Sequence, residues 1–257
     1  MHTLKGFPDA PNLKDKLANM MLEGAANMAI SDPAITSTRR VVTFALLRLI
    51  GHRIATSTWS EGTKQVVWTA CTTAFFTSAR LGELLAKREN AFDPSADLLW
   101  GQVSFKGTEA ALIHIKIPKA ASSEGDFLDV FPFEASPYCP LAALAKLAED
   151  QKKLGMFQPG MPVFRFPSGK NLTPAKLNKI LHELLKDIYK AGSNSISCHS
   201  FRAGIPSALR MFPDLASTED IKGWGRWASD CHSKYTRLRV DQRRAIFRKI
   251  TAVLATA

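Results

Sequence analysis

Several stretches of the sequence carry side chains that could hold a phosphate group and move a proton beside it. The segment CHSFRAG, residues 198–204, places His199 and Arg202 three residues apart, which on a helix is one face. Arginine offers a charged fork of hydrogen-bond donors, and histidine can donate or accept a proton near neutral pH. A phosphate site would use both groups, whereas a surface helix can carry the same pair without any function. The residues elsewhere in the chain have to decide between the two.

Three further stretches carry residue types suited to the same chemistry. Arg80 lies in TSARLGELL after a long apolar segment, and Lys119 lies in IKIPKAASSEG at the end of a predicted strand. GWGRWASDCHSKYTR contributes Arg226, Trp227 and Tyr235. A second arginine allows two-point donation that lysine cannot copy, a lysine can protonate a leaving oxygen, and a tyrosine oxygen can attack phosphorus. Each residue taken singly has an ordinary structural explanation, so the weight rests on the order and spacing of the whole set.

In order and spacing, these stretches resemble the tyrosine recombinase (phage integrase) family. The family pattern begins with an arginine in a T-G-x-R-x-x-E-L context, which Arg80 matches here, and continues with a lysine on a β-hairpin, best matched by Lys119. An H-x-x-R motif follows, here residues 199–202. Then comes a glycine before a His or Trp that precedes the nucleophilic tyrosine by nine residues. Here Arg226 holds the His/Trp position, and Tyr235 stands nine residues later.

The chain departs from the family pattern at two positions. Ser78 stands where the family has glycine after the first threonine, and Arg226 stands where it has His or Trp. Trp227 follows directly, which leaves two alternatives: Arg226 donates to the phosphate, or Trp227 packs under the site. The G-R-W sequence at residues 225–227 also resembles a form found in some transposon-borne eukaryotic members.

The resemblance implies transesterification of DNA by a tyrosine, with no metal ion or other cofactor. The Tyr235 oxygen would attack a backbone phosphate, forming a 3′-phosphotyrosyl link and freeing a 5′-hydroxyl. Because the link conserves the phosphodiester energy, a returning hydroxyl can reverse the step without ATP. The implied roles are phosphate clamping by Arg80 and Arg202, proton donation by Lys119, assistance by His199 and Arg226, and support from Glu83 and Trp227. Lys106 and Lys116, near the same hairpin, compete with Lys119 for the role of general acid.

The composition favours a polyanion as the partner. The chain has 257 residues, with 34 Lys and Arg against 23 Asp and Glu, a formal net charge of +11. Such an excess is typical of DNA- or RNA-binding proteins, although a generally basic surface gives the same number. The cysteines form no CxxC pair and match no usual zinc spacing, and no apolar run is long enough to cross a bilayer. We therefore expect an intracellular protein that binds double-stranded DNA, cytoplasmic if prokaryotic or viral and nuclear if eukaryotic.

The elements that must position these residues are predicted to be mostly helices. Four segments repeat apolar residues at helical spacing: residues 41–54, 63–76, 141–154 and 175–190. The helix-start signals are Ser60, Pro140 and Thr173. Three short segments are rich in β-branched or aromatic residues, as strands are: residues 98–105, 111–117 and 126–133. The pattern predicts a mainly α protein with a small antiparallel sheet (α+β), and the resemblance implies the tyrosine recombinase (integrase) catalytic-domain fold.

The chain divides at about residue 38. Residues 1–37 are interrupted by prolines, and we interpret them as a lead-in or linker, with the remnant of an N-terminal DNA-binding domain as an alternative. The resemblance covers residues 38–257, which we interpret as one catalytic domain with a C-terminal tail helix.

The tail after Tyr235 is predicted to form an amphipathic helix. Its apolar residues recur at helical spacing: Val240, Ile246, Phe247, Ile250, Val253 and Leu254. This stripe can fold back on its own domain or dock on a second protomer. In the resembled family such tails often join neighbouring protomers, so we favour the second alternative and expect a homo-oligomer, dimer to tetramer, on DNA. A chain cut before Val240 is then predicted to fold and bind DNA without assembling.

The leading hypothesis is a site-specific DNA recombinase or integrase, with integration of a transposable element as its setting. A type IB topoisomerase shares the Tyr, Arg, Lys and His chemistry but relaxes DNA without a specific site. A DNA-binding regulator of the same fold that has lost catalysis is the alternative from another class. The T-x-x-R-x-x-E-L and H-S-F-R contexts favour the recombinase over the topoisomerase, and the complete catalytic set argues against the regulator.

Overall fold

The computed structural model describes residues 41–116, 126–134, 136–187, 196–197, 199–212, 214–226 and 239–256. Its helices are α2 (Phe44–Ala55), α3 (Glu61–Thr77), α4 (Leu81–Leu84), α5 (Pro140–Lys153), α6 (Pro174–Leu184), α7 (Gly204–Met211), α8 (Thr218–Gly225) and α9 (Val240–Thr256). The strands are β1 (Val103–Lys106), β2 (Ala110–Ile115) and β3 (Asp126–Val130), and a 3-10 turn, η1 (Trp100–Gln102), precedes β1. The predicted class, mainly α with a small antiparallel sheet, is confirmed.

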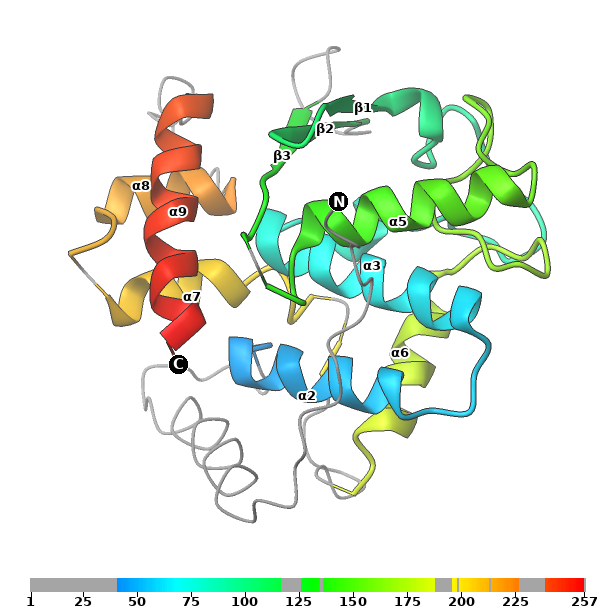
Figure 1. Cartoon of the computed structure of the whole chain (residues 1–257), viewed down its shortest axis with the longest axis horizontal. Helices are drawn as coiled ribbons and strands as arrows, with labels where there is room; N and C mark the ends of the chain where they lie inside the picture. Colours follow the sequence, from blue (N-terminus) through cyan, green and yellow to red (C-terminus); the bar gives the residue numbers. More distant parts are fainter. Residues whose placement is uncertain are drawn as a thin grey trace.

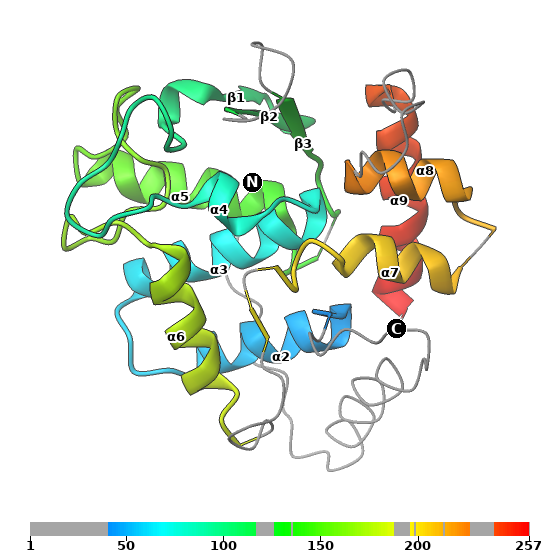
Figure 2. The same ribbon diagram turned by 180° about the vertical axis from the view of Figure 1, so that it is seen from behind.

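The helices form two groups around the sheet. Helices α3 and α5 pack together below the sheet, and α2 packs against the other side of α3 with α6 beside it (Figure 1). Helices α7, α8 and α9 gather at one side, where β3 and α3 approach them (Figures 1 and 2). This layout brings the end of α3, the start of β3 and the end of α8 to the same region of the molecule.

Helix α3 is the central helix, as its nearly continuous apolar sequence predicts. It begins at the expected residue, because the Ser60 hydroxyl accepts a hydrogen bond from the Thr63 N–H. The helix is buried almost all round, so its polar side chains need internal partners. Gln65 and Thr69 both donate to the Ala143 carbonyl of α5, at 2.8 and 3.1 Å. The two helices are thus joined by polar contacts as well as by packing.

The sheet is antiparallel in the order β1-β2-β3. Ile113 of β2 lies opposite Val103 on one side and Leu128 on the other, and these residues face the core. The first strand is shorter than residues 98–105, because the Trp100 and Gly101 N–H groups donate to carbonyls of the 159–161 segment and fold into η1 instead. The two other predicted segments also end early as strands, at Ile115 and Val130.

Helix α9, the predicted tail helix, is packed on its own chain. Four residues of the apolar stripe are buried: Ile246, Phe247, Ile250 and Leu254. The Phe247 ring lies 5.6 Å from both Phe76 of α3 and Phe131 after β3, and 6.3 Å from the Trp224 ring of α8. The structure therefore shows the alternative that the sequence analysis ranked second, and a chain cut before Val240 would lose part of its own core.

We expect Phe247→Ala to destabilise the domain strongly. The substitution leaves a cavity between three elements, and a buried Phe→Ala change costs about 3–5 kcal/mol of the free energy of unfolding. Urea unfolding followed by circular dichroism measures this cost. Phe127→Ala is the matched control, because the Phe127 ring is 45% exposed on the sheet, and its cost should stay near 1 kcal/mol or below. Equal costs for the two variants would contradict the packing of α9.

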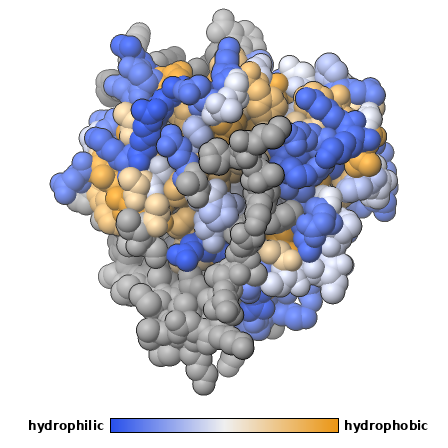
Figure 3. Space-filling model, viewed as in Figure 1, coloured by the Kyte–Doolittle hydropathy of each residue, from blue (hydrophilic) through white to orange (hydrophobic). Residues whose placement is uncertain are grey.

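The described surface is largely hydrophilic on the face that Figure 3 shows, with smaller hydrophobic areas between the charged groups. Within the described residues, no helix is both long and apolar enough to span a bilayer.

Candidate functional site

Arg80 owes its position to a sharp turn at the end of α3. The helix ends at Thr77, and Ser78 adopts a left-handed backbone with a φ of 52°. The chain is thereby redirected, and Arg80 becomes the N-cap residue of α4. A left-handed conformation costs a residue with a Cβ about 1–2 kcal/mol, which is a physical reason for the glycine that the family pattern has at this position.

Glu83 holds Arg80 through two hydrogen bonds. Its carboxylate accepts a hydrogen bond from the Arg80 backbone N–H at 2.9 Å and one from Arg80 Nη1 at 3.0 Å. The Arg80 side chain is 56% exposed, whereas that of Glu83 is 13% exposed. The Glu83 carboxylate therefore holds one side of the Arg80 guanidinium, and more than half of the Arg80 side chain is exposed to solvent.

His199 and Arg202 do not share a helical face. Residues 199–203 form turns that precede α7, and the Arg202 N–H donates to the His199 carbonyl at 3.2 Å. His199 is exposed, whereas Arg202 is 3% exposed. The expectation of a common helix face was wrong, because the helix begins only at Gly204.

Gly204 holds this turn against α3. A Cβ at Gly204 would come within 2.5 Å of the Phe75 ring and 3.1 Å of the Val42 carbonyl oxygen, so only glycine fits without displacing them. The Val42 N–H also donates to the Ser200 carbonyl at 3.1 Å. Close packing and backbone bonding together fix the Arg202 turn beside the end of α3, and so beside Arg80.

Arg202 is a buried guanidinium with one terminal nitrogen hydrogen-bonded and the other without an acceptor among the described residues. Its Nη2 donates to the Gly225 carbonyl at 2.7 Å and to the Arg226 carbonyl at 3.2 Å. Its Nη1 is buried and has no hydrogen-bond acceptor within the described part of the chain. Burial, followed by the charges of Arg80 and Arg226, lowers the pKa of Arg202 to about 10, so the group is still cationic at neutral pH. An anion that reached Nη1 would accept a hydrogen bond from it and offset part of the excess positive charge.

Arg226 lies at the centre of an ion-pair network. It caps α8 with a left-handed φ of 52°, and its Nη2 lies 2.6 Å from Glu83 Oε2. Its Nη1 lies 3.1 Å from Asp126 Oδ2, and all three side chains are 9–13% exposed. Burial alone would raise the pKa of the Glu83 carboxyl, but the charge and hydrogen bond of Arg226 and the contacts from Arg80 and Arg202 lower it. Glu83 is therefore ionised at neutral pH.

The structure thus brings together four of the predicted site residues, which are Arg80, Glu83, Arg202 and Arg226. They come from α4, from the turn before α7 and from the end of α8. Three arginines face two carboxylates, so the cluster carries an excess positive charge and would attract an anion. His199 lies on the same turn as Arg202. Lys119, Trp227 and Tyr235 lie outside the described residues.

Asp126 belongs to this network, and the sequence analysis missed it. It begins β3, and its side chain is on the inward face of the strand together with those of Leu128 and Val130. A carboxylate at an inward position of a strand needs a cationic or hydrogen-bonding partner. The alternation in DFLDV was therefore a signal that could have drawn attention to this residue.

The two competing lysines differ in their surroundings. Lys106 ends β1 and is exposed. Lys116 follows β2 and donates through its Nζ to the Pro94 carbonyl. Neither lysine contacts the arginine cluster through an ion pair or hydrogen bond in the described segments.

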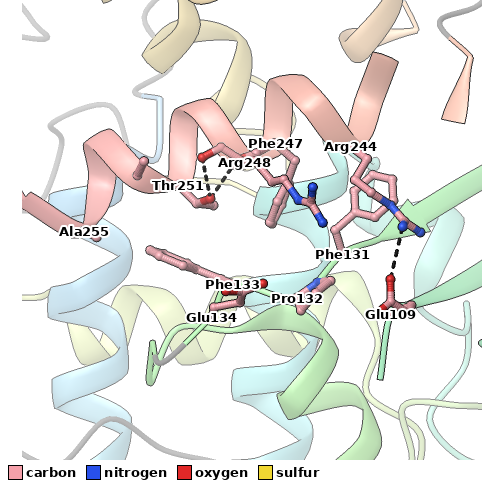
Figure 4. Close-up of a pocket in the computed structure, with 11 residues that line it drawn as sticks. Glu109, Phe131, Pro132, Phe133, Glu134, Arg244, Phe247, Arg248, Thr251 and Ala255 are labelled. Atoms are coloured by element: carbon pink, nitrogen blue, oxygen red, sulfur yellow. Dashed lines mark hydrogen bonds and ion pairs between the residues drawn. The ribbon is translucent and has the colours of Figure 1, made fainter. Parts of the chain in front are cut away.

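A cavity beside α9 does not coincide with the arginine cluster. It measures about 420 Å³ and lies between α9 and the segment after β3 (Figure 4). Its floor is apolar, with Phe131, Phe133 and Phe247, and Arg244 pairs with Glu109 at its rim at 3.1 Å. None of the cluster residues lines it.

Two solved structures share the architecture of this chain. One is the XerH site-specific recombinase bound to difH substrate in a pre-cleavage complex, with a TM-score of 0.51, 12% identity and 86% of this chain covered. The other is XerH bound to palindromic difH in a post-cleavage complex, with a TM-score of 0.50, 12% identity and 89% covered. The chain has the tyrosine recombinase catalytic-domain fold. It spans 55% of the length of each XerH chain. Neither a family model nor a curated protein matches the sequence.

Proposed function

We propose that this protein is a site-specific DNA recombinase or integrase that cuts and rejoins DNA through a 3′-phosphotyrosyl intermediate. The observation that carries the proposal is the buried Nη1 of Arg202, which has no acceptor in the part of the chain that the structure describes and lies beside Arg80 in a cluster with excess positive charge. A phosphodiester is the anion that two such guanidinium groups fit, because each offers paired donors to non-bridging oxygens. The fold shared with DNA-bound XerH agrees with this substrate.

The proposed reaction uses the arginines to stabilise the transition state. Arg80 and Arg202 hold the non-bridging oxygens as negative charge accumulates on them. The Tyr235 oxygen bonds to phosphorus, and the bond from phosphorus to the 5′-oxygen breaks. Lys119 gives a proton to that leaving oxygen, and His199 assists proton transfer at the tyrosine or holds the phosphate. Attack of a 5′-hydroxyl on the phosphotyrosyl bond then rejoins DNA and frees the tyrosine.

The finer parts of the proposal rest on the sequence. The G-R-W sequence at residues 225–227 resembles that of some transposon-borne recombinases, and this resemblance supports DNA integration as the proposed cellular role. Double-stranded DNA is the partner, and a homo-oligomer assembles on it. Because α9 is packed on its own chain, that assembly requires either an exchange of α9 between protomers or another surface. The protein acts in the cytoplasm of a prokaryote or virus-infected cell, or in a eukaryotic nucleus.

A suicide DNA substrate tests the proposal. A nick beside the cleavage site lets the 5′-hydroxyl fragment diffuse away, so the protein stays joined to DNA and gives a band on a denaturing gel. DNA from the ends of the associated element is the specific substrate, and a scrambled duplex is the control. A covalent band only with the specific duplex supports the recombinase. Relaxation of any supercoiled plasmid indicates the topoisomerase, and binding without a band indicates the regulator.

DNA binding should weaken steeply with salt. Each phosphate neutralised contributes about −0.9 to the slope of log K against log salt concentration, and we expect at least about three contacts, a slope of about −3 or steeper. Gel shifts between 50 and 200 mM salt, roughly the range over which such effects are large, measure this slope. Arg80→Gln should make the slope shallower by about 1. A flat profile for the unaltered protein would contradict a DNA-binding face.

A further inference from the structure

We propose that Arg226 is a positioning residue and not a phosphate ligand, and that Asp126 is its partner in this role. The inference rests on the proposed function and decides between the two alternatives that the G-R-W sequence leaves open. Arg226 holds together the elements that carry Arg80 and Arg202, and it acts on the scissile phosphate only through those two residues.

The first reason is that both terminal nitrogens of Arg226 are already bound. Nη2 lies 2.6 Å from Glu83 Oε2, and Nη1 lies 3.1 Å from Asp126 Oδ2. The side chain is only 9% exposed. To reach a phosphate, the guanidinium would have to leave two nearly buried carboxylates, and removing one partner of a buried ion pair is strongly unfavourable because the other charge stays buried without compensation.

The second reason is that Arg226 supports both other arginines, Arg202 by a direct hydrogen bond and Arg80 through Glu83. Its backbone carbonyl, with that of Gly225, accepts from Arg202 Nη2. Its guanidinium binds the same Glu83 carboxylate that accepts from the Arg80 backbone and side chain. A shift of Arg226 would therefore move the supports of Arg80 and Arg202 together.

The third reason is the distribution of charge. The Arg226 cation is balanced by two carboxylates, so little of its charge remains to attract a phosphate. Arg202 has carbonyl oxygens as its hydrogen-bond acceptors in the described segments, and Arg80 shares Glu83 with Arg226. The excess positive charge of the cluster is thus presented by Arg80 and Arg202.

Asp126 connects this support to the hairpin. It is the first residue of β3 and follows Lys119 by seven residues in the sequence. The Asp126–Arg226 ion pair therefore ties the strand that follows the proposed general acid to the helix end that precedes the proposed nucleophile.

The test compares a natural phosphodiester with a methylphosphonate at the scissile position, in single-turnover cleavage at saturating DNA. The methylphosphonate is neutral, so a residue that only balances phosphate charge becomes less important. Arg202→Gln should regain about tenfold or more of its lost rate on the neutral substrate relative to the unaltered protein, as expected for a lost electrostatic contact. Arg226→Gln should also regain part of its lost rate, because it acts through Arg80 and Arg202, with half-site affinity unchanged within about threefold. Asp126→Asn, which removes only the support of Arg226, should show the same loss and recovery. A phosphate ligand predicts that Asp126→Asn, which leaves Arg226 charged and less restrained, loses little rate, and that result would overturn the proposal.

A double variant keeps the test decisive if Arg226→Gln folds poorly. The single substitution removes the Arg226 cation from Asp126 and leaves Glu83 with Arg80 alone, and adding Asp126→Asn removes the carboxylate charge that has lost this cation. The double variant should therefore cleave the ordinary phosphodiester about tenfold faster than Arg226→Gln alone, because its loss comes from the disturbed support. A phosphate-ligand role predicts no recovery, and that result would also overturn the proposal. If the unaltered protein forms no covalent band on the phosphodiester, the proposed function fails instead.

Discussion

Tyr235→Phe is expected to abolish covalent capture of the suicide DNA substrate while the protein still binds its half-site. Phenylalanine keeps the aromatic ring and its packing but has no oxygen to attack phosphorus, so no phosphotyrosyl bond can form. The loss should exceed that of every other single substitution, because the remaining residues only accelerate a reaction that needs this oxygen. Denaturing gels measure the covalent product, and gel shifts measure half-site binding.

The two other tyrosines provide matched controls for this prediction. Tyr138 is partly buried against the core, with its ring centroid 5.4 Å from that of Phe44 and 6.0 Å from that of Trp68, so Tyr138→Phe should retain the covalent band. Tyr189→Phe should retain it as well, since Tyr189 falls outside the family's spacing. A band that persists in Tyr235→Phe and disappears in one of these controls would transfer the nucleophile to that tyrosine.

Local signals in the sequence predicted the fold well. Ser60 and Thr173 act as caps, and Pro140 stands at the first turn of α5, because capping depends on a few neighbouring residues. Contacts between distant segments were harder to foresee. The first part of the predicted strand at residues 98–105 became η1, because its N–H groups bond to carbonyls about 60 residues later, and no local pattern encodes such pairing.

The candidate site, like the fold, could be predicted only in part from local sequence, and the rest depends on contacts between distant segments. The order of Arg80, Arg202 and Arg226 along the chain marked the arginines that the fold brings together. Their different environments could not be predicted, because whether a guanidinium meets carboxylates or carbonyls depends on tertiary packing. Asp126 was missed for this reason, as was the contact of α9 with its own domain.

The last prediction concerns Arg202, whose Nη2 donates to the Gly225 carbonyl and whose Nη1 is the proposed donor to the phosphate. Arg202→Lys keeps the positive charge but cannot both bind the Gly225 carbonyl and present a second donor pair to a phosphate. We expect the single-turnover cleavage rate to fall by about 10²–10³-fold, the range for losing one preorganised donor to a transition state. Half-site binding should change far less, because binding draws on many phosphate contacts.

Arg210→Lys is the matched control for Arg202→Lys. Arg210 is exposed on α7, the helix that follows the Arg202 turn, so the same chemical change falls on the same part of the fold outside the cluster. Its cleavage rate should stay within about threefold of the unaltered protein, as for most surface substitutions. If Arg202→Lys cleaves as fast as Arg210→Lys, a simple cation is sufficient at that position. Arg202 Nη1 would then not contribute to stabilising the transition state, and the proposed function would lose its main support.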